Sequence, residues 1–183
     1  MAHIHTEPGQ VDHTVTAFIV RTDGDQPRLL FHLHKKYGVL LPAGGHIELD
    51  ETPWAAMAHE IKEETGYELN QLQVMQPRLR VDGLHGVINH PQPLRVNTHN
   101  AAPDHYHSDI AYLFATDQTP AHAPGEGEST DIRWLTRAEL AALPDDQIFV
   151  DARQTGLVIL DQFLDAWEPV PAAEFSLEKA AKR

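Results

Sequence analysis

Three glutamates stand close together in the chain and could hold a divalent cation. They are Glu60, Glu63 and Glu64, and in a helix residues three and four apart share one face. Carboxylates that close repel one another unless a cation neutralises them, and hard oxygen ligands select Mg²⁺, Mn²⁺ or Ca²⁺. The alternative interpretation is a solvated acidic face, because glutamate is a good helix former.

The segment around these glutamates has the pattern of a helix. Thr52 is suited to cap its start, Pro53 fits the first helical position and Gly66 can end it. Apolar side chains recur with the spacing i, i+3, i+4 and i+7, at Trp54, Met57, Ala58 and Ile61. At about 100° per residue the glutamates lie to one side of this stripe, so the stripe can be buried while the carboxylates face a cleft.

A longer pattern surrounds the helix. From Gly45 the chain runs through five residues to Glu51 and through seven more to His59-Glu60-Ile61-Lys62-Glu63-Glu64-Thr65-Gly66-Tyr67. This closely resembles the Nudix box, G-x5-E-x7-R-E-U-x-E-E-x-G-U, in which U is a bulky aliphatic residue. The preceding Leu41-Pro42-Ala43-Gly44-Gly45-His46-Ile47-Glu48 is similar to the family's usual lead-in, so the resemblance covers 27 residues.

The resemblance implies a fold and an activity. The implied fold is a mixed α/β (α+β) domain, with a mixed β-sheet between helices and the box as a loop-helix-loop. The implied activity is a hydrolase that cleaves a diphosphate linkage by Mg²⁺- or Mn²⁺-assisted attack of water. Its substrate would be a nucleoside diphosphate derivative or a nucleoside triphosphate.

Residue roles also follow from the resemblance. Glu60, Glu63 and Glu64 match the family's metal-binding glutamates, with Glu64 usually central. The carbonyl of Gly44, just before the box, matches a backbone metal ligand.

Many family members add an acidic residue from a loop before a late strand tryptophan. Glu128, six residues before Trp134, is the best candidate here, and Glu126 is second. Glu63, Glu64 and Glu128 are therefore the expected catalytic residues, and either Glu63 or Glu128 would accept the proton of the water.

The box departs from the family pattern at one charged position. His59 stands where the family has an arginine that pairs with the glutamate at the Glu51 position and braces the loop. Histidine makes that contact best when charged, and its ordinary pKa is only about 6.5. Ala43 and Tyr67 are milder departures. The rate and pH optimum are the properties that these changes affect.

A second polar segment is His105-Tyr106-His107-Ser108-Asp109, before an apolar run. In a regular strand His105, His107 and Asp109 share one face, where they could bind substrate phosphate or a further metal. The alternative is a polar strand end that faces solvent. For His32 and His34 we expect a surface or rim position.

The substrate is narrowed only by elimination. Gly83 stands where ADP-ribose enzymes of the family tend to carry a proline, and Leu84 and His85 stand where dinucleoside polyphosphate enzymes often have a tyrosine. A nucleoside triphosphate or a general nucleoside diphosphate derivative is left as the expected substrate.

The competing hypothesis is a Nudix-fold binding or regulatory module that senses a nucleotide without cutting it. The glutamates of the box argue against this module, and His59 is the one feature in its favour.

The remaining elements follow from hydrophobic periodicity and turn residues. Strands are expected at residues 14–20, 28–34, 39–41, 72–81, 110–116 and 131–135, a long loop at 83–103, and further helices at 136–143 and 154–167. We assign residues 1–168 to the Nudix hydrolase domain and 169–183 to a loosely held C-terminal tail.

Composition excludes several classes of protein. The 183 residues suffice for one domain, and the absence of cysteine excludes disulfides and thiolate metal sites. A net charge of −13 argues against a nucleic-acid-binding face. No apolar run is long enough for a membrane span and no signal peptide is evident, so a cytoplasmic protein is expected. A homodimer stays open.

Overall fold

A mixed sheet forms the centre of the computed structural model. The structure describes residue 4 and residues 7–179. Within that part of the chain the sheet has nine strands. They are β1 (Val11–Arg21), β2 (Arg28–His34), β3 (Val39–Leu41), β4 (Ala43–His46), β5 (Gln73–Gln76), β6 (Arg95–Ala102), β7 (His105–Thr116), β8 (Ile132–Thr136) and β9 (Glu168–Pro171). The sheet order is β3-β2-β1-β7-β5-β9, with β4 on β1, β6 on β7 and β8 on β2.

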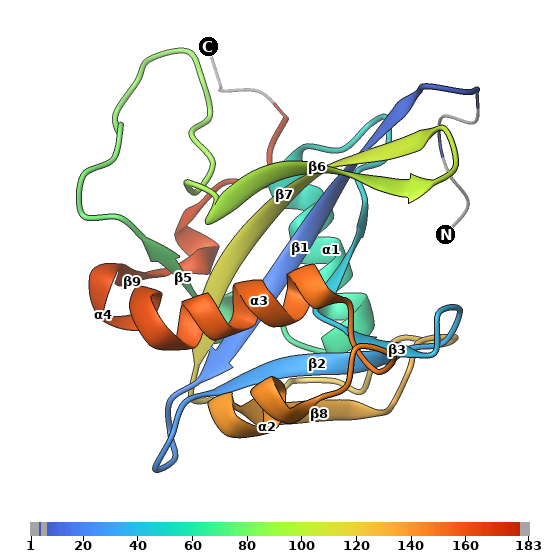
Figure 1. The fold of residues 1–183 in the computed structure, drawn as a ribbon. Coiled ribbons are helices and arrows are strands. Elements are labelled where there is room, and N and C mark those ends of the chain that lie inside the picture. The colour runs from blue at the N-terminus through green and yellow to red at the C-terminus, as the bar shows by residue number, and fades with distance from the viewer. Residues whose placement is uncertain (1–3, 5–6, 180–183) are drawn as a thin grey trace.

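The parallel pair β1 and β7 forms the middle of the sheet (Figure 1). Their register runs without a break from Val11 opposite Tyr106 to Arg21 opposite Thr116. The two apolar runs expected as strands lie inside them, and β7 begins five residues earlier than expected, at His105. The polar residues before each run are therefore part of the central sheet.

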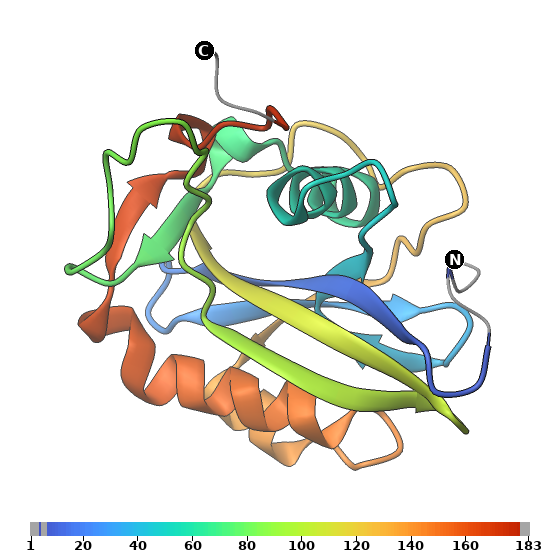
Figure 2. The same ribbon diagram turned by 90° about the horizontal axis from the view of Figure 1, so that it is seen from above.

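Helices cover both faces of the sheet (Figure 2). Helix α1 (Pro53–Thr65) packs on one face, and α2 (Arg137–Ala142) and α3 (Val150–Val158) lie on the other. Side chains alternate across a strand, so Val15, Ala17 and Ile19 face α1 while Phe18 and Val20 face α3. This arrangement confirms the expected mixed sheet between helices.

Helix α1 begins and ends as expected. The Thr52 hydroxyl accepts a hydrogen bond from the Ala55 amide at 3.2 Å, and Pro53 is the first helical residue. Gly66 ends the helix with φ of 75°, a left-handed conformation that disfavours side chains. Trp54 and the other large members of the apolar stripe are fully buried.

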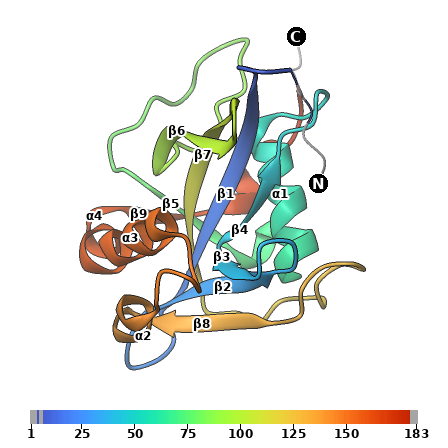
Figure 3. The same cartoon turned by 45° about the vertical axis from the view of Figure 1, so that its right-hand side comes forward.

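Strands β2 and β3 have the expected bounds. Strand β8 begins and ends one residue later in the sequence than expected. Figure 3 shows β8 alongside β2. The Thr136 side chain caps α2 by accepting from the Glu139 amide, as expected.

Two expectations about the middle of the chain are wrong. The expected loop at 83–103 contains β6, which pairs antiparallel with β7, and β5 ends at Gln76 instead of residue 81. Strand β6 is largely exposed and is held to β7 by backbone hydrogen bonds, so it needs few apolar side chains. Its sequence therefore lacks the alternation of apolar and polar residues that would predict a strand. The segment after Gln76 leaves the sheet.

The C-terminal segment also differs from its expectation. The helix begins at Val150, four residues before the expected start, and passes through a π-helical turn (Ile159–Phe163) into α4 (Leu164–Ala166). Strand β9 then pairs with β5. Ala172 is fully buried, and the Trp54 indole donates to the Phe175 carbonyl at 3.3 Å.

The boundary drawn at residue 168 therefore cuts through the domain. The expected loose tail at 169–183 is wrong for the part that forms β9 and covers Trp54, and residues 180–183 lie outside the described residues. Among the described residues, no helix combines the length and the apolar character needed to cross a membrane.

Candidate functional site

The three glutamates of α1 differ sharply in their exposure. Glu60 and Glu64 are only 4% and 6% exposed, whereas the side chain of Glu63 is 51% exposed. Sequence reasoning placed all three at a cleft beside the apolar stripe. The structure instead buries two of them and leaves Glu63 open to solvent.

The surroundings of Glu64 are polar. The Gly44 amide of β4 donates a hydrogen bond to Glu64 Oε2 at 2.7 Å. A Cβ atom at Gly44 would stand 2.1 Å from the Val15 carbonyl oxygen, so only glycine lets β4 lie this close to β1. The same carboxylate oxygen lies 3.5 Å from His32 Nε2.

Burial controls the protonation of this group. It raises the pKa of Glu60 to about 7 and that of Glu64 to about 8, and the charges of Glu63 and Glu128 add to both effects. Burial also lowers the pKa of His32 to about 4. In the metal-free protein both shifts favour the neutral forms of His32 and Glu64, so burial disfavours an ion pair between them. His32 is 2% exposed, so the expected surface position is wrong for it.

The loop between β7 and β8 lies against the end of α1. The Gly125 amide donates to the Glu63 carbonyl at 2.7 Å, and the His122 amide donates to the Gly66 carbonyl at 3.1 Å. This loop carries the half-buried Glu128, whose charge acts on the buried glutamates, whereas Glu126 is exposed. The structure thus brings Glu128 towards α1, which we call the acidic helix because it carries Glu60, Glu63 and Glu64.

His59 contacts two carboxylates. Its Nδ1 lies 3.4 Å from Glu51 Oε1 and its Nε2 lies 3.0 Å from Glu63 Oε1. The other oxygen of Glu51 accepts from the Glu48 amide at 3.3 Å, which links the loop before the helix to the same contact. Partial burial lowers the pKa of His59, but the hydrogen bond to Glu63 and the charges of Glu63 and Glu51 outweigh it, so the pKa is raised.

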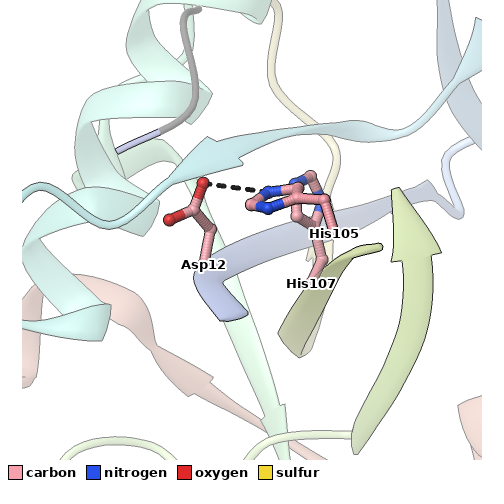
Figure 4. A group of neighbouring side chains, drawn as sticks. All are labelled: Asp12, His105 and His107. Atoms are coloured by element: carbon pink, nitrogen blue, oxygen red, sulfur yellow. Dashed lines mark ion pairs between the residues drawn. The ribbon is translucent and has the colours of Figure 1, made fainter. Parts of the chain in front are cut away.

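The second polar segment divides between two environments. His105 and His107 meet Asp12 of β1, with His105 Nε2 3.2 Å from Asp12 Oδ2 (Figure 4). Asp109 is instead held by three donors. It accepts from the Thr14 hydroxyl at 3.0 Å, from the Thr16 hydroxyl at 2.8 Å and from Nδ2 of the Asn97 side chain at 3.3 Å.

Sequence reasoning missed Asp12. The only signal was an acidic residue just before an apolar strand, and such a residue is usually exposed. His105 and His107 stand more than ninety positions further along the chain, so no local spacing could reveal their contact with Asp12.

The fold and the acidic helix define a class of protein. A mixed sheet lies between helices, and a loop-helix-loop presents three carboxylates beside a backbone segment that only glycine can form. Oxygen donors of this kind suit a hard divalent cation. These are the features of a Nudix-fold protein.

Comparison with known proteins agrees with that class. The NUDIX domain family matches residues 12–155, and the chain belongs to this family. A MutT-like protein of Streptomyces ambofaciens is 31% identical over 136 residues, which are 74% of this chain and 71% of that protein.

Solved structures share the fold. A hydrolase of the NUDIX family from Clostridium perfringens is 28% identical, with a TM-score of 0.64 over 82% of this chain and 96% of that one. The NUDIX domain of NrtR from Shewanella oneidensis, solved with ADP ribose, has a TM-score of 0.56 and 16% identity over 80% of this chain and 84% of that one. The second similarity concerns the fold alone.

Proposed function

We propose that this chain is a hydrolase that uses Mg²⁺ or Mn²⁺ to cleave a diphosphate linkage in a nucleoside diphosphate derivative or a nucleoside triphosphate. The observation that carries the proposal is the burial of Glu60 and Glu64 on one side of α1, with Glu64 bound by the Gly44 amide. Membership of the NUDIX family supports the same reaction class.

The residues present fit a divalent cation. Two buried carboxyls with raised pKa values are unfavourable as anions in the protein alone, and a dication is the partner that would stabilise them in that form. Glu60, Glu63 and Glu64 would hold it, with the Gly44 carbonyl as the expected backbone ligand. When bound, the cation neutralises charge on the diphosphate oxygens and lowers the pKa of a bound water.

The chain's own residues would orient the reaction. The Gly44 amide fixes one oxygen of Glu64, so the other oxygen has a defined direction. His59 holds Glu63 at 3.0 Å and connects it to the loop through Glu51. We therefore assign Glu51 and His59 as the structural brace of the box.

Two carboxylates can take the proton from water. Glu63 is exposed, and its carboxylate is already engaged by His59 Nε2 at 3.0 Å. Glu128 is half-buried on a loop that contacts the last turn of α1. We propose Glu128 as the base, with Glu63 kept as a metal ligand.

A nucleotide substrate is the best supported class. The NrtR domain was solved with ADP ribose, which contains a diphosphate linkage between two ribose units. The net charge of −13 means that an anionic substrate would need the cation to approach the acidic helix.

The test is a screen of nucleoside triphosphates and nucleoside diphosphate derivatives with Mg²⁺, Mn²⁺ or excess chelator. Added inorganic pyrophosphatase converts a pyrophosphate product to phosphate, and added phosphomonoesterase does the same for phosphomonoester products, so that phosphate release reports cleavage of the diphosphate linkage. We expect turnover that the chelator abolishes and that Glu64→Gln lowers by about 10² to 10⁴ at similar Tm, since several kcal/mol of charge stabilisation are lost. Glu68→Gln is the matched control, because Glu68 pairs with Lys62 away from the buried glutamates.

The outcomes separate the two functions proposed for the fold. Full activity of Glu64→Gln contradicts the assigned site. Tight nucleotide binding without turnover, in the parent protein with Mg²⁺, would instead support the binding module.

A further inference from the structure

A second group of potential metal ligands lies away from the acidic helix. Asp12 of β1 and His105 and His107 of β7 each offer one ligand atom, and these atoms lie within 4.8 Å of one another. Figure 4 shows the Asp12 carboxylate directed at the two imidazole rings. Asp12 is fully buried, His105 is 8% exposed and His107 is partly buried.

The sheet explains why these residues meet. β1 and β7 are parallel, and Asp12 stands directly opposite His107. His105 and His107 are two residues apart in one strand, so both side chains emerge on the same face. The arrangement belongs to the central sheet, which gives the donors a fixed spacing.

This group and the acidic helix lie on opposite faces of the sheet. Alternation along β1 places Asp12 on the same face of the sheet as Phe18, which belongs to the apolar cluster that includes Ala152 of α3. Helix α1, with Glu60 and Glu64, packs on the side of Val15 and Ala17. A cation held by the glutamates therefore does not reach Asp12.

A further histidine lies beside this group. His46 of β4 is opposite Thr14, and its Nε2 lies 3.5 Å from Asp12 Oδ2. Its ring centroid is 4.9 Å from that of His107. The carboxylate of Asp12 also accepts a hydrogen bond from the Ile4 amide at 3.1 Å. His46 lies next to Asp12 but outside the three residues whose ligand atoms are within 4.8 Å of one another, so its ring must turn towards them to supply a fourth ligand.

The donor set selects a kind of ion. Imidazole suits Zn²⁺ and other first-row transition ions, whereas Mg²⁺ prefers oxygen donors alone. Tetrahedral Zn²⁺ at about 2.0–2.1 Å from each ligand needs donors about 3.4 Å apart. The three ligand atoms lie within 4.8 Å of one another, so side-chain rotation must bring them closer together around an ion.

We propose that Asp12, His105 and His107 bind one first-row transition ion of the Zn²⁺ type, with His46 as the fourth ligand. The ion joins β4 and the first residues of β1 to the start of β7. The competing explanation is a metal-free cluster in which a protonated histidine neutralises Asp12. The proposal does not rest on the hydrolase activity.

The experiment uses the full chain without a histidine tag, dialysed against chelator and kept in excess Mg²⁺ to occupy the acidic helix. Co²⁺ is titrated and followed by its visible absorption, and Zn²⁺ is then added as a competitor. We expect one Co²⁺ per chain, displaced by Zn²⁺, in the parent protein. Binding in His107→Gln and Asp12→Asn should be at least tenfold weaker.

Two controls make the result specific. His13→Ala removes an exposed histidine from the same strand on the other face, and Glu64→Gln removes a carboxylate from the acidic helix. Both should bind Co²⁺ like the parent. If His107→Gln fails to fold, Asp12→Asn and a Zn²⁺-induced rise in the Tm of the parent decide.

Several outcomes overturn the proposal. These are no Co²⁺ binding by the parent, unchanged binding in the variants of Asp12 and His107, or loss of binding in Glu64→Gln. The last result would place the ion at the acidic helix.

Discussion

His59 Nε2 lies 3.0 Å from Glu63 Oε1, one helical turn further along α1. Because Nδ1 of the same ring approaches Glu51 Oε1 at 3.4 Å, one imidazole links the loop before the helix to an expected metal ligand. Both contacts are strongest when the ring is charged, and both partners are carboxylates. The charge state of His59 therefore affects the loop and the acidic helix together.

The first prediction concerns His59→Arg. The pKa of His59 is raised in the folded protein, so its pairing contributes stability at low pH and is lost as pH rises through the folded pKa. Guanidinium stays charged at all working pH values. We expect the variant to be as active as the parent or more active, with the gain concentrated above neutrality, in pH–rate profiles at matched Mg²⁺.

His122→Arg is the control for this prediction. The exposed His122 side chain lies 3.4 Å from Glu68, which is not one of the carboxylates that His59 contacts. The same change at His122 should therefore leave the pH–rate profile unaltered. Superimposable profiles of His59→Arg and the parent would mean that His59 is a solvated helix residue and not a brace.

The second prediction compares two loop glutamates. Glu128→Gln should lower kcat by about 10² to 10⁴, the usual contribution of a general base, with little change in Tm. Glu126→Gln removes the same charge from an exposed position in the same loop and should retain activity. Equal rates for the two variants would shift the role of base to Glu63.

The third prediction concerns Mg²⁺ and pH. Glu60 and Glu64 have folded pKa values of about 7 and about 8, raised from the ordinary 4.5, so the metal-free protein loses stability as pH rises from 4.5 to these folded values. Within that range the free energy of unfolding falls by about 1.4 kcal/mol per pH unit for each carboxyl that releases its proton on unfolding. We therefore expect Mg²⁺ to raise Tm more at pH 8.5 than at pH 5.5.

Thermal unfolding of the parent and Glu64→Gln with and without Mg²⁺ checks this expectation. The variant should lose part of the pH dependence, because one titrating carboxyl is gone. An equal Tm increase at both pH values speaks against cation binding by the buried glutamates.

The fourth prediction separates backbone strain from steric contact at a helix end. Gly66 has φ of 75°, and an added Cβ would stand 2.0 Å from the His122 carbonyl oxygen. Gly83 has φ of 68° and no atom within 4 Å of that position. Gly83→Ala should cost about 1–2 kcal/mol, and Gly66→Ala clearly more, because the loop must also move.

Chemical denaturation of both variants measures the difference in the free energy of unfolding. Since the displaced loop carries Glu128, Gly66→Ala should also reduce activity. Equal destabilisation by the two substitutions would mean that the loop yields at no cost.

Much of this protein follows from its sequence because the determining interactions are local. Thr52, Pro53 and Gly66 set the ends of α1 through caps and backbone conformation. The spacing of glutamates along one helix determines that they share a face. The resemblance to the Nudix box adds the family, which the NUDIX match over residues 12–155 confirms, and the mixed sheet, which the fold confirms.

Features that depend on distant backbone pairing were decided only by the tertiary structure. β6 and β9 have weak patterns of their own and form because β7 and β5 offer edges for hydrogen bonding. The burial of Glu60 and Glu64 depends on β4 and on the loop that carries Glu128.

The Asp12 cluster shows the same division most clearly. The sequence determined that His105 and His107 share a face, because that follows from alternation within one strand. It suggested Asp109 as their companion by the same rule, but two threonines and Asn97 hold that carboxylate. Asp12 meets the histidines because the register between β1 and β7 places it there, and a register between strands so far apart in the chain is set by packing of the whole sheet.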